Sequence, residues 1–139
     1  GNKVDAFLEN IGAVQIDAVA GIESRGFLFG LMLANRLNVP FVPIRKIGKL
    51  PYETVQQEYE LEYGSAVLEV HADAIVQGDR ILIHDDLLAT GGTVAASSEL
   101  IKRLGGEVAG FAFLVELNFL NGREKLKDFS DNIHVLASF

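Results

Sequence analysis

The sequence contains no cysteine and no tryptophan, and only three prolines and one methionine occur among its 139 residues. Without cysteine the chain can form neither a disulfide nor a cysteine-ligated zinc site, which fits a reducing compartment. No run of about 18 apolar residues is present, so no transmembrane helix is expected. The amino-terminal residues also lack the basic and apolar stretches of a secretory signal. We therefore expect a cytoplasmic protein that does not bind membranes.

Basic residues are scarce as well. The chain has 12 Lys and Arg against 19 Asp and Glu, which gives a formal net charge of −7 at pH 7. Nucleic acids require a cationic face, so none is expected as a partner, although a local basic pocket stays compatible with this charge. Hydrophobic residues make up 49% of the chain and charged residues 22%, which is typical of a globular protein. The length fits a single domain over residues 1–139.

Apolar runs bounded by glycine alternate with helix-like segments along the chain. Strands are predicted over 16–22, 39–44, 80–83, 108–115 and 133–138, and helices over 24–37, 93–104 and 121–128. Strict alternation over 58–63, continued over 66–71, predicts a β-hairpin. Pro40 and Pro43 favour an edge position or an irregular end for their strand. Strands separated by helices predict an α/β fold, a mostly parallel central sheet with helices on both faces.

One segment changes from a buried strand to two acids and then to a loop of small residues that opens a helix. The acids are Asp85 and Asp86, and the loop consists of Ala89, Thr90, Gly91, Gly92 and Thr93. Consecutive backbone N–H groups at a helix start can bind an anion, although the Gly-Lys-Ser/Thr ending of a P-loop is missing. Carboxylates accept hydrogen bonds from vicinal hydroxyls and can bind magnesium. The segment therefore indicates a ribose-phosphate site.

Residues 85–93 resemble the phosphoribosyl pyrophosphate motif of the type I phosphoribosyltransferase family. Further motifs, in order along the chain, resemble its adenine-specific members: residues 21–30, 44–51, 61–64, 115–117 and 122–125. The resemblance implies a purine salvage enzyme that converts adenine and 5-phosphoribosyl 1-pyrophosphate to AMP and pyrophosphate. It also implies Mg²⁺ carried on the pyrophosphate, with Asp85 as a candidate contact and no other direct protein ligand, and a homodimer.

The resemblance also implies a role for each matching residue. Asp85 and Asp86 would hold the ribose hydroxyls, and the loop would hold the 5′-phosphate. Glu62 is the expected catalytic base, because Ala89 stands where hypoxanthine-specific relatives have an aspartate, and Arg25 is the expected catalytic cation. The remaining expected substrate-binding residues are Glu23, Ser24, Lys46, Lys49, Tyr63 and Leu117. The stretch over 47–63 would form a lid, and the Glu23–Ser24 peptide bond would be cis.

Two departures from the family pattern affect these expectations. Family members carry an amino-terminal hood over the purine, and this chain begins near the end of that segment, so either the hood is absent or the sequence is part of a longer protein. His84 stands where the family usually has an aliphatic residue, and we expect it to be structural. Two alternative functions stay open: a non-catalytic regulator that senses phosphoribosyl pyrophosphate, and a hypoxanthine or guanine phosphoribosyltransferase.

Overall fold

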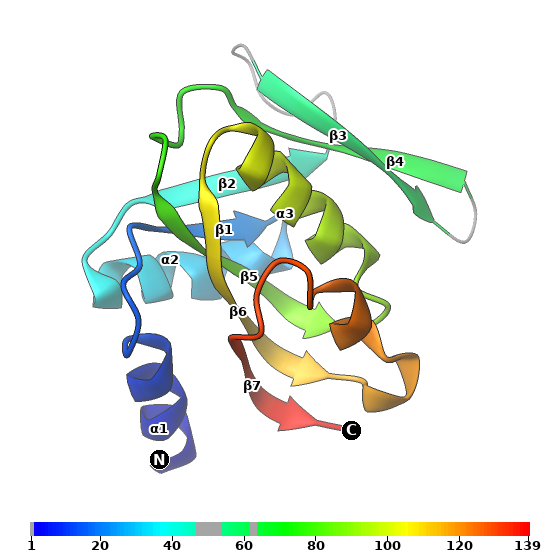
Figure 1. The fold of residues 1–139 in the computed structure, drawn as a ribbon. Coiled ribbons are helices and arrows are strands. Elements are labelled where there is room, and N and C mark those ends of the chain that lie inside the picture. Colours follow the sequence, from blue (N-terminus) through cyan, green and yellow to red (C-terminus); the bar gives the residue numbers. More distant parts are fainter. Residues whose placement is uncertain (1, 47–53, 62–63) are drawn as a thin grey trace.

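The computed structural model describes residues 2–46, 54–61 and 64–139 (Figure 1). The elements are α1 (Asn2–Ile11), β1 (Ala18–Ile22), α2 (Arg25–Leu37), β2 (Phe41–Lys46), β3 (Thr54–Leu61), β4 (Gly64–His71), β5 (Arg80–Leu88), α3 (Gly92–Arg103), β6 (Glu107–Glu116), the 3₁₀ turns η1 (Asn118–Leu120) and η2 (Gly122–Lys125), and β7 (Ile133–Ser138).

The strands form one seven-stranded sheet in the order β3-β4-β2-β1-β5-β6-β7. Strands β2, β1, β5, β6 and β7 run parallel, while β3 and β4 form an antiparallel hairpin that joins the sheet beside β2. The predicted mostly parallel sheet and the predicted hairpin are therefore confirmed. Because the parallel strands point the same way, their carboxyl ends lie at one edge of the sheet, at the right in Figure 1.

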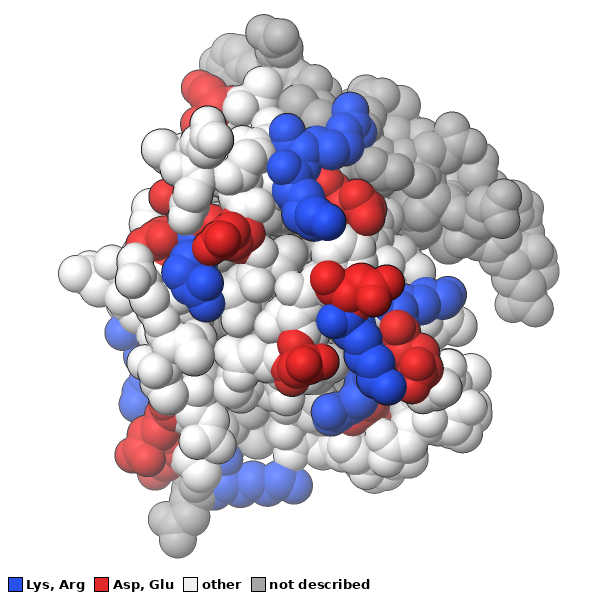
Figure 2. Space-filling model, viewed as in Figure 1, with Lys and Arg blue, Asp and Glu red and all other residues white. Residues whose placement is uncertain are grey.

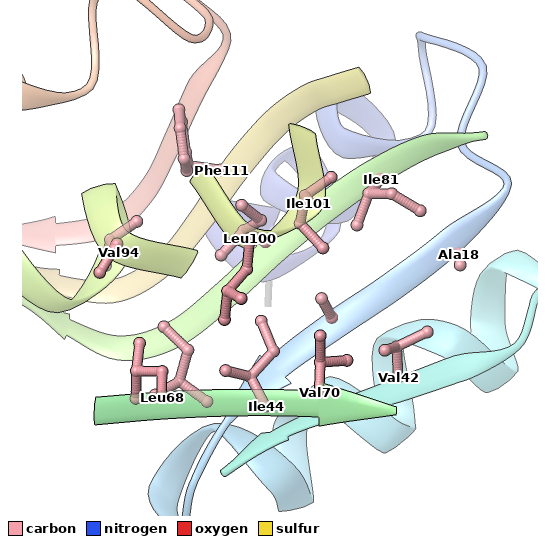
Figure 3. Packing of buried hydrophobic residues seen from close by; sticks show 14 of the residues in the cluster. Ala18, Val42, Ile44, Leu68, Val70, Ile81, Val94, Leu100, Ile101 and Phe111 are labelled. Atoms are coloured by element: carbon pink, nitrogen blue, oxygen red, sulfur yellow. The ribbon is translucent and has the colours of Figure 1, made fainter. Parts of the chain in front are cut away.

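Helices cover both faces of the sheet, as predicted. Alternate residues of a strand point to opposite faces, so Val19 of β1 belongs to one buried cluster and its neighbour Ala20 to another. Helix α3 packs on one face, where Leu100 and Ile101 point toward the strands (Figure 3). Helices α1 and α2 contribute to the other cluster, which also holds Leu82 of β5. Within the described residues, no helix is long and apolar enough to span a membrane.

Several element boundaries differ from the sequence prediction. Helix α1 was not predicted, although its buried residues Phe7 and Ile11 have helical i, i+4 spacing. The helix expected over 121–128 is instead the short 3₁₀ turn η2, which follows the 3₁₀ turn η1. Strand β2 is internal and not an edge strand, but β4 pairs only with its last two residues, Arg45 and Lys46. The prolines of this segment therefore precede the residues of β2 that pair with β4.

Candidate functional site

The two segments with unusual chemistry meet at the carboxyl edge of the sheet. Strands β1 and β5 are parallel neighbours, so the turn after β1 lies next to the end of β5. A Cβ atom placed on Gly26 would lie 3.0 Å from the His84 carbonyl oxygen and 3.6 Å from an Asp85 carboxylate oxygen. The Arg25 guanidinium reaches Asp86 at 3.8 Å, with 79% of the arginine side chain exposed. The fold thus brings Arg25 to the two acids, which lie 60 and 61 positions later in the sequence.

Asp85 and Asp86 lie within the last part of β5 and not in a loop after it, because the strand continues to Leu88. The Asp86 backbone N–H donates a hydrogen bond of 2.9 Å to an Asp85 carboxylate oxygen. Burial, together with the side-chain hydrogen bond to Asp86, raises the pKa of Asp85 to about 7. One carboxyl of the pair therefore exchanges its proton near neutral pH, while both remain half-buried at the open end of the strand.

The loop after the acids, residues 89–93, has the features expected of an anion cradle. Gly91 is the residue before α3 and has a φ of 87°, a left-handed conformation that favours glycine. The first turn of α3 contains no acidic residue, so nothing there neutralises the positive end of the helix dipole. A Cβ atom on Gly92 would have no heavy-atom contact closer than 3.9 Å, which leaves space on this side of the loop.

The turn after β6 forms a second wall of this loop. The Leu117 N–H donates a hydrogen bond of 2.9 Å to the Leu88 carbonyl oxygen. A Cβ atom on Gly91 would lie only 2.6 Å from the Gly122 carbonyl oxygen, and one on Gly122 would collide with the Ala89 carbonyl oxygen. The two backbones are therefore in direct contact, which places half-buried Leu117 at the same edge of the sheet as the loop.

An ion pair between buried Glu116 and half-exposed Arg123 holds this turn in place. The Arg123 guanidinium donates two hydrogen bonds to the Glu116 carboxylate, of 2.6 Å from Nε and 2.8 Å from a terminal nitrogen. Glu116 is only 4% exposed, and the hydrogen bonds from Arg123 keep the pKa of its carboxyl below the usual value. Sequence reasoning assigned no role to either residue, although both belong to motifs that it singled out.

The segment after β1 contains two further expected site residues, Glu23 and Ser24. The Glu23–Ser24 peptide bond is cis, as the resemblance implied. Glu23 faces Arg45 at 3.8 Å, whereas Arg25 pairs with Asp86. The Arg45 guanidinium also lies 4.8 Å from the centre of the Phe27 ring, a cation–π distance.

Other expected site residues lie outside the described part of the chain. These are Lys49, Glu62 and Tyr63, and residues 47–53 of the expected lid. Lys46 is the last residue of β2, where its backbone pairs with Leu68 of β4. Their roles therefore stay predictions.

His84 is a core residue, as expected. Its ring is fully buried 5.2 Å from the Phe29 ring, and Nδ1 donates a hydrogen bond of 2.8 Å to the Ala112 carbonyl oxygen. Burial lowers the pKa of His84 to about 4, so the ring is neutral at physiological pH. Within residues 2–46, 54–61 and 64–139, no group of three or more His, Asp or Glu side chains could hold a metal ion by itself.

Comparison with known proteins agrees with this arrangement. A family model described as the phosphoribosyl transferase domain matches residues 4–135, so the chain belongs to the phosphoribosyltransferase family. The chain is 56% identical over 126 residues to the adenine phosphoribosyltransferase of Koribacter versatilis, covering 91% of this chain and 69% of that protein. Within the family, the chain is a member of the adenine phosphoribosyltransferases.

Solved structures support the same assignment. The crystal structure of adenine phosphoribosyltransferase from Rhodothermus marinus has a TM-score of 0.93 and 50% identity, covering 99% of this chain and 78% of that chain. The enzyme from Saccharomyces cerevisiae, complexed with an imino-altritol bisphosphate and adenine, has a TM-score of 0.87 and 44% identity, covering 97% of this chain and 76% of that one. These relatives favour neither the regulator nor the hypoxanthine or guanine enzyme.

Proposed function

We propose that this chain transfers ribose 5-phosphate from phosphoribosyl pyrophosphate to adenine. The bond between the sugar C1 and the pyrophosphate oxygen breaks, a bond from C1 to the purine nitrogen forms, and the purine gives up a proton. AMP and pyrophosphate are the products. The observation that carries the proposal is that Asp85 and Asp86, in the last part of β5, shortly precede the small-residue loop at the start of α3.

The acids and the cradle divide the substrate between them. Asp85 and Asp86 accept hydrogen bonds from the ribose hydroxyls, and their negative charge stabilises the positive charge that develops on the sugar. Backbone N–H groups of residues 89–93, with the hydroxyls of Thr90 and Thr93, bind the 5′-phosphate. This division is supported by the short chain distance between the acids and the cradle, which matches a sugar and its own phosphate.

The pyrophosphate is expected at the turn after β1. Arg25 is mostly exposed and reaches Asp86 at 3.8 Å, so it can exchange this long ion pair for phosphate oxygens. Glu23 and Ser24 frame the same turn. The carboxylate oxygens of Asp85 and Asp86 fit Mg²⁺, which binds through one or two carboxylates plus phosphate oxygens and would neutralise the leaving pyrophosphate.

The purine is expected beside Leu117, with Glu62 as the base that accepts its proton. Tyr63, Lys46 and Lys49 belong to the proposed lid, which would exclude water from the reacting sugar. The Saccharomyces relative, which carries adenine, supports adenine as the base for this chain. A cytoplasmic location is part of the same proposal.

An AMP-forming assay tests the proposal. Adenine, hypoxanthine and guanine are each supplied with phosphoribosyl pyrophosphate, with Mg²⁺ and with a chelator. We expect AMP from adenine with Mg²⁺, and little product from the other bases. The variant Glu62→Gln should lower kcat far more than the affinity for phosphoribosyl pyrophosphate. A preference for hypoxanthine or guanine, or no transfer to any base, would contradict the proposal.

We also propose a homodimer, because one face of α2 exposes large apolar side chains. Leu28, Leu31 and Met32 are 75%, 52% and 58% exposed and lie at helical i, i+3, i+4 spacing. Such a patch is costly to leave in water and fits a second copy of the chain. Leu28→Glu combined with Met32→Glu should give monomers in sedimentation experiments. Val76→Glu, at another exposed apolar position, should leave the wild-type assembly unchanged.

A further inference from the structure

The anion cradle has no cationic side chain of its own. Residues 89–93 are Ala-Thr-Gly-Gly-Thr, and the basic residues of α3 lie in its last turn, at Lys102 and Arg103. A phosphate monoester carries a charge of about −1.5 to −2 at neutral pH. Backbone N–H groups and a helix dipole complement only part of this charge, so a cation from elsewhere in the fold would complete the site.

The turn that packs on the cradle brings such a cation. Lys125 is the last residue of η2, the turn whose Gly122 contacts the cradle backbone. The Lys125 Nζ atom lies 3.9 Å from the position that a Cβ atom on Gly92 would occupy, and Thr90 Oγ1 lies at the same distance from it. The ammonium group therefore sits beside the open side of the cradle, together with one of its hydroxyls.

The charge of Lys125 is not neutralised by a neighbouring acid. In the described part of the chain, no ion pair involves Lys125, whereas Lys127 pairs with Glu124 of the same turn at 2.8 Å. Basic and acidic side chains are interspersed over the face seen in Figure 2. Whether a basic side chain on such a surface is neutralised therefore depends on which acid lies next to it. Glu124, the acid of this turn, is thus paired with Lys127 and not with Lys125.

The backbone that carries Lys125 is held firmly. Arg123, two residues earlier, makes two hydrogen bonds with buried Glu116 at the end of β6. Because the start of η2 is fixed in this way, the flexible lysine stem begins at a defined point next to the cradle. The entropy that is lost when the ammonium group binds an anion is correspondingly smaller.

From this geometry we infer that Lys125 is a substrate-binding residue whose ammonium group pairs with the 5′-phosphate held by residues 89–93. The inference rests on the proposed function, because it assumes that a ribose phosphate occupies the cradle. It assigns a second role to the η1–η2 turn, which then contributes both a backbone wall and a charge to the phosphate site.

Binding measurements on matched lysine variants test this inference. Lys125→Met and Lys127→Met each remove one exposed lysine of the same segment, and Lys125→Arg keeps the charge. Affinities for AMP, ribose 5-phosphate and magnesium pyrophosphate are measured by calorimetry. We expect Lys125→Met to weaken AMP and ribose 5-phosphate binding about tenfold, as for the loss of a charge-assisted hydrogen bond. Pyrophosphate affinity should change less than twofold, and Lys125→Arg should restore most of the loss.

The outcomes separate the two claims. If wild-type protein binds AMP and ribose 5-phosphate but Lys125→Met binds them equally well, Lys125 is not a phosphate ligand and the proposed function stands. An equal loss in Lys127→Met would also overturn the inference, because it would indicate a general charge effect. If wild-type protein binds neither compound, the proposed function fails and the inference fails with it. Thermal unfolding of each variant checks that exposed Lys125 does not act through stability.

Discussion

Removal of Arg123 should destabilise the protein, because it leaves the Glu116 carboxylate buried without its partner. The Glu116 side chain is 5% exposed and that of Arg123 is 44% exposed. Exposed ion pairs contribute up to about 1 kcal/mol, and breaking a fully buried pair costs about 3–5 kcal/mol. A pair with one buried and one half-exposed member falls between these limits, so we expect Arg123→Met to cost about 2 kcal/mol.

The two partners should differ in the cost of their removal. Glu116→Gln leaves Arg123 half-exposed to water, so it should cost about 1 kcal/mol or less. The double variant Glu116→Gln/Arg123→Met should be more stable than Arg123→Met alone, because it no longer buries an unpaired charge. Urea unfolding at pH 7 measures these differences, and a loss of 2 kcal/mol corresponds to a melting temperature lower by about 7 °C. Arg36→Met, at an exposed position of α2, is the matched control.

The pH dependence gives an independent check. Arg123 lowers the pKa of Glu116 in the folded chain, so the pair's contribution is fully present above the unfolded value of 4.5 and is lost as pH falls through the lower folded value. The stability gap between wild type and Arg123→Met should therefore be full at pH 7 and narrow below pH 4.5. Equal stability of the two proteins at pH 7, or a double variant no better than Arg123→Met, would refute the reasoning.

Three further predictions concern the site and the core. Asp85→Asn combined with Asp86→Asn should leave the melting temperature near that of wild type but abolish AMP formation. Retained turnover would show that these acids do not bind the ribose. Gly92→Val should block phosphate binding without unfolding the chain. Gly91→Val should also unfold the chain, because a Cβ atom on Gly91 would lie 2.6 Å from the Gly122 carbonyl oxygen. Calorimetry with AMP and thermal unfolding distinguish the two variants. The pKa of His84 is lowered to about 4 in the folded chain, whereas the unfolded chain binds a proton below about pH 6.5. The contribution of the neutral His84 ring to stability is therefore present above pH 6.5 and falls by about 2 kcal/mol between pH 6.5 and 5. In urea unfolding, His84→Val should lack the fall in stability that wild type shows between pH 6.5 and 5. The raised pKa of Asp85 gives a contribution to stability that is lost as pH rises through about 7, and this contribution is the same in both proteins.

The local elements of the site could be predicted because their signals are consecutive in the sequence. The apolar run of β5, the acids and the small-residue loop before α3 follow one another within thirteen residues of one motif (81–93), and the structure has them in that order. The strand end and the η turns were predicted less well. Strand β5 continues past Asp85 and Asp86 because its pairing with β6 extends to Leu88. No pattern of neighbouring residues in the sequence predicts how far that pairing extends.

Which charged side chains meet at the site depends on the pairing of strands that are distant in sequence. Nothing in the local sequence selects Asp86 over Glu23 as the partner of Arg25, because the choice depends on β1 and β5 being parallel neighbours. The contact between Glu116 and Arg123 likewise depends on the path of the η1–η2 turn, in which Asn121 adopts a left-handed conformation.

The sequence by itself therefore determined the alternation of strands and helices, the location of the two acids and the loop that follows them, because hydrophobic period and glycine placement act over a few neighbouring residues. Only the tertiary structure decided which charged groups meet at the sheet edge, how the turn after β6 braces the loop, and where the Lys125 ammonium group lies. These contacts join residues that are distant in sequence, and their distances follow from the parallel packing of β1, β5 and β6.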